Sequence, residues 1–220
     1  MSLLSFEPFF RDDIYACIYH FRIRLPKTYC ISASYADLSP SKNFFSRHLS
    51  PDKTRKSHLD LFSDSILIYS QDDTVDSLHA LADITSHIMM YAIQQEKPIP
   101  LKGAIAAGRM TCNQTKQLYF GQALIDAYLL EENVKYYGVL VHHSAEKYIK
   151  KEDFKEFRDI KAPLKSGEIA HYELHWYDAV IKKEGKNEKT VKECLNNLRL
   201  TVSDEPRKYI DNTQKVIDIH

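Results

Sequence analysis

The chain has 220 residues, with 30 basic and 30 acidic side chains, and 44% of its residues are hydrophobic. This length and composition suit a globular protein with a sizeable core and exclude an intrinsically disordered chain. The balanced charge gives no field that would attract nucleic acid, and no apolar run approaches the roughly 20 residues needed to cross a bilayer. We therefore expect neither nucleic acid nor a membrane as a partner.

The four cysteines are too widely spaced for a zinc-binding or disulfide framework. Cys17, Cys30, Cys112 and Cys194 form no C-x-x-C pair, which is typical of a protein in a reducing compartment. The first residues lack the charged start of a signal peptide. We expect a cytoplasmic protein.

The N-terminal half predicts a strand pair followed by a helix. Residues 13–25 fit either a strand or a helix, and residues 26–56 form an irregular excursion. Residues 61–70 alternate apolar and polar side chains around a polar centre, which predicts two short strands with Asp64 near their turn. A helix then begins at Asp73 or Thr74 and continues to about residue 95. Its predicted buried stripe is Val75, Leu78, Ala82, Thr85, Met89 and Ala92.

The second half predicts further strands and helices. Residues 101–110 form a strand rich in small residues, and residues 122–134 form a helix. The predicted inner face of that helix is Leu124, Tyr128 and Leu129. Strands at 136–143 and 171–181 flank a charged segment around 146–168. Two helices, at 187–200 and 202–220, end the chain.

This order of elements predicts an α+β fold with helices covering one face of the sheet. We expect one domain over residues 1–180 and a helical C-terminal extension over residues 181–220.

Three neighbouring segments carry a family resemblance. They are FSDS with Ser63-Asp64, KGAIAAG at 102–108, and a Phe120-Gly121 pair that opens a helix ending in Leu130-Glu131. Their order and spacing resemble class III adenylyl and guanylyl cyclases over about residues 58 to 145. The form of the segments looks closer to the bacterial pyrimidine (cytidylate and uridylate) cyclases of anti-phage signalling.

The resemblance implies a ferredoxin-like cyclase fold with a mostly antiparallel sheet. It also implies a metal-dependent conversion of a nucleoside triphosphate to a 3′,5′-cyclic monophosphate and pyrophosphate. In such enzymes two carboxylates hold Mg²⁺ or Mn²⁺, which lowers the pKa of the attacking ribose hydroxyl. The site forms between two chains, so the resemblance implies a homodimer.

Asp64 matches the family's hairpin carboxylate and is the principal candidate metal ligand and catalytic residue. The alternative is a turn aspartate that satisfies local amides. Asp13, 51 residues earlier, is the candidate for the first-strand carboxylate, although the glycine and phenylalanine that should follow it are absent. The alternative for Asp13 is a helix N-cap, and on that alternative one metal ligand is missing.

The substrate-binding candidates lie around the same hairpin. Asp60 stands four residues before Asp64, at the family's base-reading position, where it could accept a hydrogen bond from a base amino group. Ser63 and Ser65 flank Asp64. The family's adenine-reading aspartate is replaced by Leu118, so the adenylyl pair is absent. Cytosine and guanine carry the amino group that Asp60 could bind, and Asp60 is alternatively a solvated strand-edge residue; the form of the segments favours a pyrimidine.

Two family positions that contact ribose and phosphate are apolar here, namely Ile125 and Leu129. The transition-state charge must then be met by other cations, and Arg109 (catalytic), Lys102 (substrate-binding) and Lys116 are the candidates. Each is alternatively a surface or interface cation. A cyclase-fold module that binds a nucleotide or dimerises without turnover is the alternative function.

Overall fold

A computed structural model describes most of the chain. The described residues are 14–23, 57–62, 65–70, 72, 74–95, 98–113, 116, 118–149, 155–178 and 188–218. For 14–23, 57–62 and 188–190 only the backbone is described.

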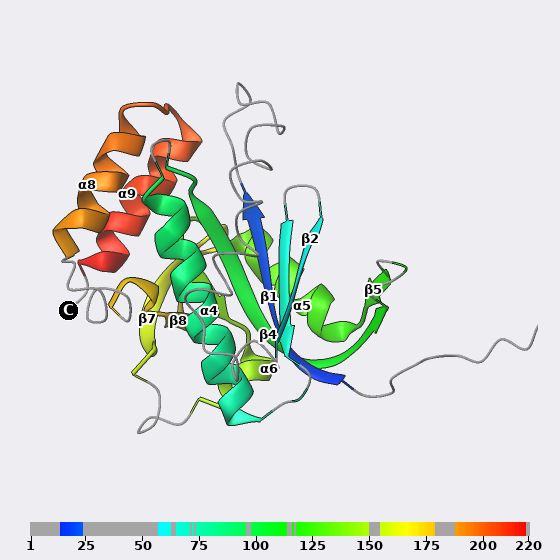
Figure 1. Ribbon diagram of the computed structural model, residues 1–220. Helices are drawn as coiled ribbons and strands as arrows, with labels where there is room; N and C mark the ends of the chain where they lie inside the picture. Colours follow the sequence, from blue (N-terminus) through cyan, green and yellow to red (C-terminus); the bar gives the residue numbers. More distant parts are fainter. Residues whose placement is uncertain are drawn as a thin grey trace, which may run out of the picture.

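The described strands form one eight-stranded sheet (Figure 1). They are β1 (Ile14–Ile23), β2 (Ser57–Phe62), β3 (Ser65–Ser70), β4 (Leu101–Asn113), β5 (Leu118–Phe120), β6 (Val139–Val141), β7 (Phe157–Leu164) and β8 (Gly167–Leu174). Their order is β2-β3-β1-β4-β6-β8-β7, and β5 pairs with the end of β4. Neighbouring strands are antiparallel except for β4 and β6, so the predicted α+β fold with a mostly antiparallel sheet is confirmed.

Helices cover both faces of this sheet, not one face as predicted. The described helices are α4 (Val75–Ile93), α5 (Gln122–Asn133), α6 (His143–Glu146), α8 (Glu188–Arg199) and α9 (Glu205–Ile217). Because side chains alternate along a strand, Ile66 and Ile68 of β3 pack in the core with α4. Leu67 and Tyr69 pack with α5 on the other face, as Figure 1 shows for the two helices.

The start of α4 follows the predicted capping chemistry. Thr74 is the N-cap, and its hydroxyl accepts the amide N–H of Ser77 at 3.3 Å. The predicted stripe is buried, with Val75 partly so, but burial extends around most of the helix. No helix in the described part of the chain is long and apolar enough to cross a membrane.

Two strand predictions in the C-terminal half were wrong. The charged segment around 146–168 contains β7, in which Phe157, Ile160 and Ala162 are buried among charged neighbours. Its partner β8 ends at Leu174, and Trp176 and Tyr177 are buried after the strand. β7 is the last strand in the sheet order, and charged residues on an edge strand limit pairing with other chains.

The two C-terminal helices pack against the main core. Leu195 and Leu198 of α8 and Tyr209 and Ile210 of α9 belong to the same buried cluster as α4, and Figure 1 shows the pair beside that helix. Both helices match the prediction, with Pro206 in the first turn of α9. The predicted boundary at residue 180 lies outside the described residues.

A buried carboxylate ties α9 to the sheet. Glu173 of β8 accepts the Tyr136 hydroxyl at 2.8 Å and the Arg158 Nε at 2.6 Å. Arg158 also donates to the carbonyl of Val216 in α9 at 2.6 Å. Burial raises the pKa of Glu173 from 4.5 to about 7, against the opposing effects of Arg158 and Tyr136.

This raised pKa predicts a pH-dependent stability. The folded chain holds the Glu173 proton more tightly than the unfolded chain, so the contribution is complete below pH 4.5 and is lost as pH rises through about 7. Relative to Glu173→Gln, the wild-type free energy of unfolding should therefore fall between these pH values. Urea unfolding at half-unit pH steps measures it, and parallel profiles for the two proteins contradict the prediction.

Candidate functional site

The β2–β3 hairpin sits where the sequence predicts it. β2 ends at Phe62 and β3 begins at Ser65, and these two residues pair. Ser63 and Asp64, which join the strands, lie outside the described residues. On the other side of β3, Ser65 lies opposite Arg22 of β1, which in turn lies opposite Lys102 of β4. This row of paired residues marks the end of the sheet at which the hairpin turns.

The strand register places the described neighbours of the two predicted metal ligands at different levels of the sheet. Ile14, which follows Asp13 in the chain, pairs with Met110 of β4, whereas Ser65, which follows Asp64, lies opposite Arg22. The eight steps along β1 from Ile14 to Arg22 span about 26 Å of extended strand. Asp13 and Asp64 themselves lie outside the described residues. A metal site shared by Asp13 and Asp64 therefore stays a prediction.

The remaining hairpin candidates stay near the turn. Asp60 pairs through its backbone with Leu67, and Ser65 is partly buried at the start of β3. The structure therefore brings Asp60 and Ser65 to the hairpin that carries Asp64, as the resemblance requires.

Lys102 lies at the same end of the sheet, but its side chain turns into the protein. Its ammonium is 2.8 Å from the Glu131 carboxylate and donates to the Glu131 carbonyl at 2.8 Å. Both side chains are almost completely buried, at 4% and 0% exposed. Because this pair joins β4 to the last turn of α5, Lys102 holds the helix and is not placed to bind the phosphates of a substrate.

Arg109 lies at the other end of β4, beside the start of α5. It is exposed, and it pairs with Tyr15 of β1. Gly121, which caps α5, has a φ of +153°, and a Cβ there would overlap the Arg109 carbonyl oxygen and lie 2.7 Å from the Met110 Cα. A glycine is thus required for β4 and α5 to approach each other here. Lys116, the third candidate cation, is a turn residue between β4 and β5.

The outer face of α5 is apolar. Ala123, Ala127 and Leu130 are buried against the sheet. Tyr128 and Leu129, predicted to face inward, are exposed instead, and Leu124 is partly buried. The exposed large side chains on α5 and the adjoining β5 are Leu118 (50%), Phe120 (49%), Ile125 (50%), Tyr128 (41%) and Leu129 (52%). We call these five residues the α5 surface.

Close packing of α5 on β4 explains why the alanines of the helix face the sheet. A Cβ on Gly108 of β4 would meet the Ala123 Cβ at 3.4 Å, so the helix packs closely on the strand. Larger residues at Ala123 and Ala127 would push α5 away. Hydrophobicity alone assigned the large side chains to the core, whereas the spacing of the alanines is the signal that identifies the inner face.

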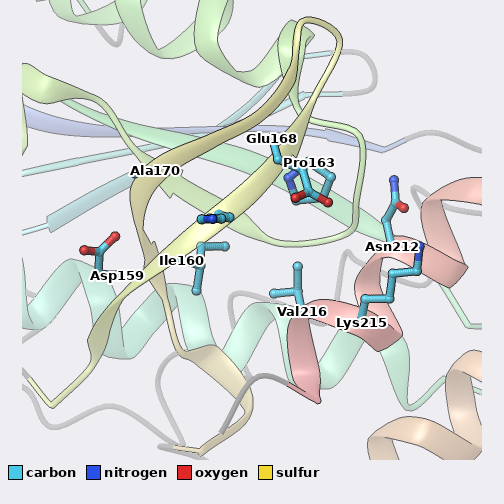
Figure 2. Close-up of a pocket in the computed structure, with 9 residues that line it drawn as sticks. Asp159, Ile160, Pro163, Glu168, Ala170, Asn212, Lys215 and Val216 are labelled. Atoms are coloured by element: carbon cyan, nitrogen blue, oxygen red, sulfur yellow. The ribbon is translucent and has the colours of Figure 1, made fainter.

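A separate pocket of about 500 Å³ lies between the β7–β8 hairpin and α9 (Figure 2). Ile160 and Pro163 of β7 and Val216 of α9 are among its lining residues. β7 and β2 are at opposite ends of the strand order, so this pocket lies far across the sheet from the hairpin of Asp64. It is not the predicted site.

The described residues alone do not form a metal site. No group of three or more potential ligands among them is arranged to hold an ion. The hairpin carboxylate Asp64 and its predicted partner Asp13 both lie outside the described residues. A two-carboxylate site is therefore not completed by the described part of one chain.

Comparisons with solved structures show the fold. No protein-family model and no curated protein matches the chain. The catalytic core of a rhodopsin-guanylyl cyclase, solved with ATPαS, is similar at 12% identity with a TM-score of 0.56, over 75% of this chain and 97% of that one. The chain has the fold of class III adenylate/guanylate cyclase catalytic domains.

Two further solved structures, both of cyclases, are less similar to this chain. A Trypanosoma brucei adenylate cyclase is 14% identical with a TM-score of 0.48, over 73% of this chain and 88% of that one. An adenylate/guanylate cyclase/hydrolase from Silicibacter pomeroyi is 15% identical with a TM-score of 0.45, over 72% and 95%. The likeness to the rhodopsin-guanylyl cyclase, at 12% identity, shows the fold alone, so the activity must be argued from the residues.

The buried Lys102–Glu131 pair predicts a large stability effect. Glu131→Gln or Lys102→Met leaves one buried charge without its partner, so each should lower the free energy of unfolding by about 3–5 kcal/mol. The double variant Lys102→Met/Glu131→Leu should recover most of that loss. The exposed pair Lys135–Glu205 is the control, since Glu205→Gln should cost no more than about 1 kcal/mol. Urea unfolding measures all four, and additive losses in the double variant contradict the prediction.

Proposed function

We propose that the protein is a cytoplasmic nucleotidyl cyclase that acts as a homodimer. It converts a nucleoside triphosphate, with a pyrimidine favoured, to a 3′,5′-cyclic monophosphate and pyrophosphate. Support comes from the cyclase fold, from the α5 surface, and from the distribution of the candidate residues over the sheet.

The α5 surface is the observation that carries the proposal of a dimer. Five large apolar side chains stand about half exposed on one helix and the strand beside it. Exposed large apolar side chains gathered on neighbouring elements are typical of a surface that another molecule covers. In the family that this chain resembles the site forms between two chains, so we assign a second copy of this chain as the molecule that covers the α5 surface.

The register independently favours a site shared between two copies. Lys102 of β4 lies opposite Arg22 of β1, which lies opposite Ser65 at the start of β3. Arg109 is seven residues further along β4 than Lys102, which is about 23 Å of extended strand. One chain therefore keeps Arg109 far from the hairpin of Asp64. A symmetric dimer can place Arg109 and the α5 surface of one copy over the hairpin of the other.

In this arrangement Asp64 is the proposed ligand of Mg²⁺ or Mn²⁺, with Asp60, Ser63 and Ser65 near the base and ribose. Arg109 of the second copy would meet the triphosphate charge, because a guanidinium binds phosphate oxygens in a fork. Asp13 is the proposed second carboxylate, although its described neighbour Ile14 lies far along β1 from Arg22, the residue opposite Ser65.

Selection of the base rests on the residues that replace the adenine-reading pair. Leu118, at the position of the adenine-reading aspartate, is half exposed on β5 and offers no hydrogen bond from its side chain. Asp60 is an acceptor and can pair with the amino group of cytosine. A pyrimidine product would fit a role in anti-phage signalling, which the resemblance implies.

A module without turnover is the second candidate function. It is favoured by the distance along β1 between Ile14 and Arg22, the residue opposite Ser65. It is also favoured by the apolar, exposed Ile125 and Leu129, because the purine cyclases that this chain resembles carry polar groups at those positions. Such a module would keep the dimer and lose the chemistry, so dimerisation and catalysis are tested separately.

Asp64→Ala should abolish cyclisation. We expect the wild type, incubated with each of the four ribonucleoside triphosphates and Mn²⁺, to form a cyclic product, and the variant to lose on the order of 100-fold or more of that rate. Asp159→Ala, an exposed carboxylate on β7, is the matched control and should leave the rate unchanged. Chromatography with mass detection identifies the product. Persistence of the product in Asp64→Ala contradicts its role, and absence of product from the wild type favours the module.

Leu129→Asp should disrupt the dimer. A charge in the centre of an apolar interface must be desolvated without a partner, so the dissociation constant should rise by about 100-fold or more. Leu200→Asp, at an 83% exposed position after α8, is the control and should have no effect. Sedimentation equilibrium measures both. A wild type that is monomeric, or a Leu129→Asp variant that dimerises normally, contradicts the proposed interface.

A further inference from the structure

His142 stands where three elements meet. It follows the last residue of β6, precedes α6, and lies beside Asp126 of α5. Its backbone N–H donates to the Ile105 carbonyl of β4 at 2.7 Å, which fixes the residue on the sheet. Its side chain is only 18% exposed.

In the observed geometry the Nδ1 atom of His142 is an acceptor. The backbone N–H of Ser144 points to this nitrogen at 3.4 Å, which makes His142 the N-cap of α6. The Ser144 hydroxyl lies 2.9 Å from the same nitrogen and accepts the Ala107 amide of β4 at 3.0 Å. Since a backbone N–H can only donate, Nδ1 carries no proton here, and the ring proton is on Nε2.

A carboxylate lies near the same nitrogen. The Asp126 Oδ2 is 3.8 Å from Nδ1, within ion-pair range but beyond a hydrogen bond. Asp126 Oδ1 already accepts the Gln122 side-chain amide at 2.7 Å, which holds the carboxylate on α5. An imidazolium carries protons on both nitrogens, so a protonated His142 can no longer accept from Ser144 and instead gains Asp126 as a partner.

We propose that His142 is a proton-operated latch, which caps α6 when neutral and pairs with Asp126 of α5 when protonated. The latch joins the helix that carries the α5 surface to the centre of the sheet. The change of partner at His142 Nδ1, from Ser144 to Asp126, follows from contacts within one chain. It holds whether or not the chain catalyses cyclisation.

The charged groups around His142 set the pH at which the latch changes. Asp126 of α5 and Glu146 of α6 favour the protonated ring, while His143 of α6 and His171 of β8 oppose it. Partial burial is the largest effect, and it lowers the pKa of His142 below its ordinary value of 6.5. The unfolded chain therefore binds this proton more tightly than the folded chain. The stability that the neutral cap supplies is present above pH 6.5 and is lost as pH falls.

Nitrogen-15 spectra of the histidine rings, recorded on the full chain from pH 5 to 8, test the latch. At pH 8 we expect His142 to carry its proton on Nε2, and the Ser144 amide shift to follow the His142 titration. Asp126→Asn should lower the His142 pKa by about half a unit or more, because the protonated form loses its partner. Asp211→Asn is the matched control, since it removes a carboxylate of α9 that pairs with Arg199 of α8. It should leave the His142 pKa unchanged.

A second variant removes the switch without removing the cap. Asparagine is a good N-cap and does not titrate, so in His142→Asn the Ser144 amide shift should be independent of pH in this range. A proton on Nδ1 at pH 8, or a His142 pKa that Asp126→Asn leaves unchanged, would overturn the proposal.

Discussion

The position of α5 depends on a charge pair buried beneath its last turn. Lys102 enters from β4 and meets both the carboxylate and the carbonyl of Glu131 at 2.8 Å. Removing two charges from water is costly, and their contact offsets that cost only when the geometry is held. Together with the close packing of Ala123 on Gly108, the pair fixes which face of α5 lies on the sheet. The opposite face, with its large apolar side chains, is consequently presented to solvent.

This orientation connects the fold to the proposed function. Because small residues pack against the sheet, α5 can expose Ile125 and Leu129 at no cost to the core. Such exposed apolar side chains are typical of a surface that another molecule covers. The strand register adds a second constraint, since it keeps Arg109 and the hairpin of Asp64 at opposite ends of the sheet. Both constraints support the proposed arrangement, in which two copies complete one site.

Local signals predicted the hairpin, the cap of α4 and the two C-terminal helices, because each depends on residues close together in the chain. β7 was missed because its buried residues, Phe157 in one cluster and Ile160 and Ala162 in another, are interspersed with charges on an edge strand. The inner face of α5 and the role of Lys102 depend on contacts between residues about 30 positions apart, as between Lys102 and Glu131. The candidate site was located by its motifs at Asp64 and Gly121. The pairing of Asp13 with Asp64 stays a prediction, because both lie outside the described residues and spacing along the chain does not reveal register across a sheet.

Mixing two defective chains tests the shared site most directly. If Asp64 and Arg109 serve one site from different copies, Asp64→Ala and Arg109→Ala are each inactive alone, but their heterodimer retains one intact site. After random exchange of subunits, the mixture should recover about a quarter of the wild-type rate of cyclic nucleotide formation. A mixture no more active than either variant alone would contradict a site completed between two copies.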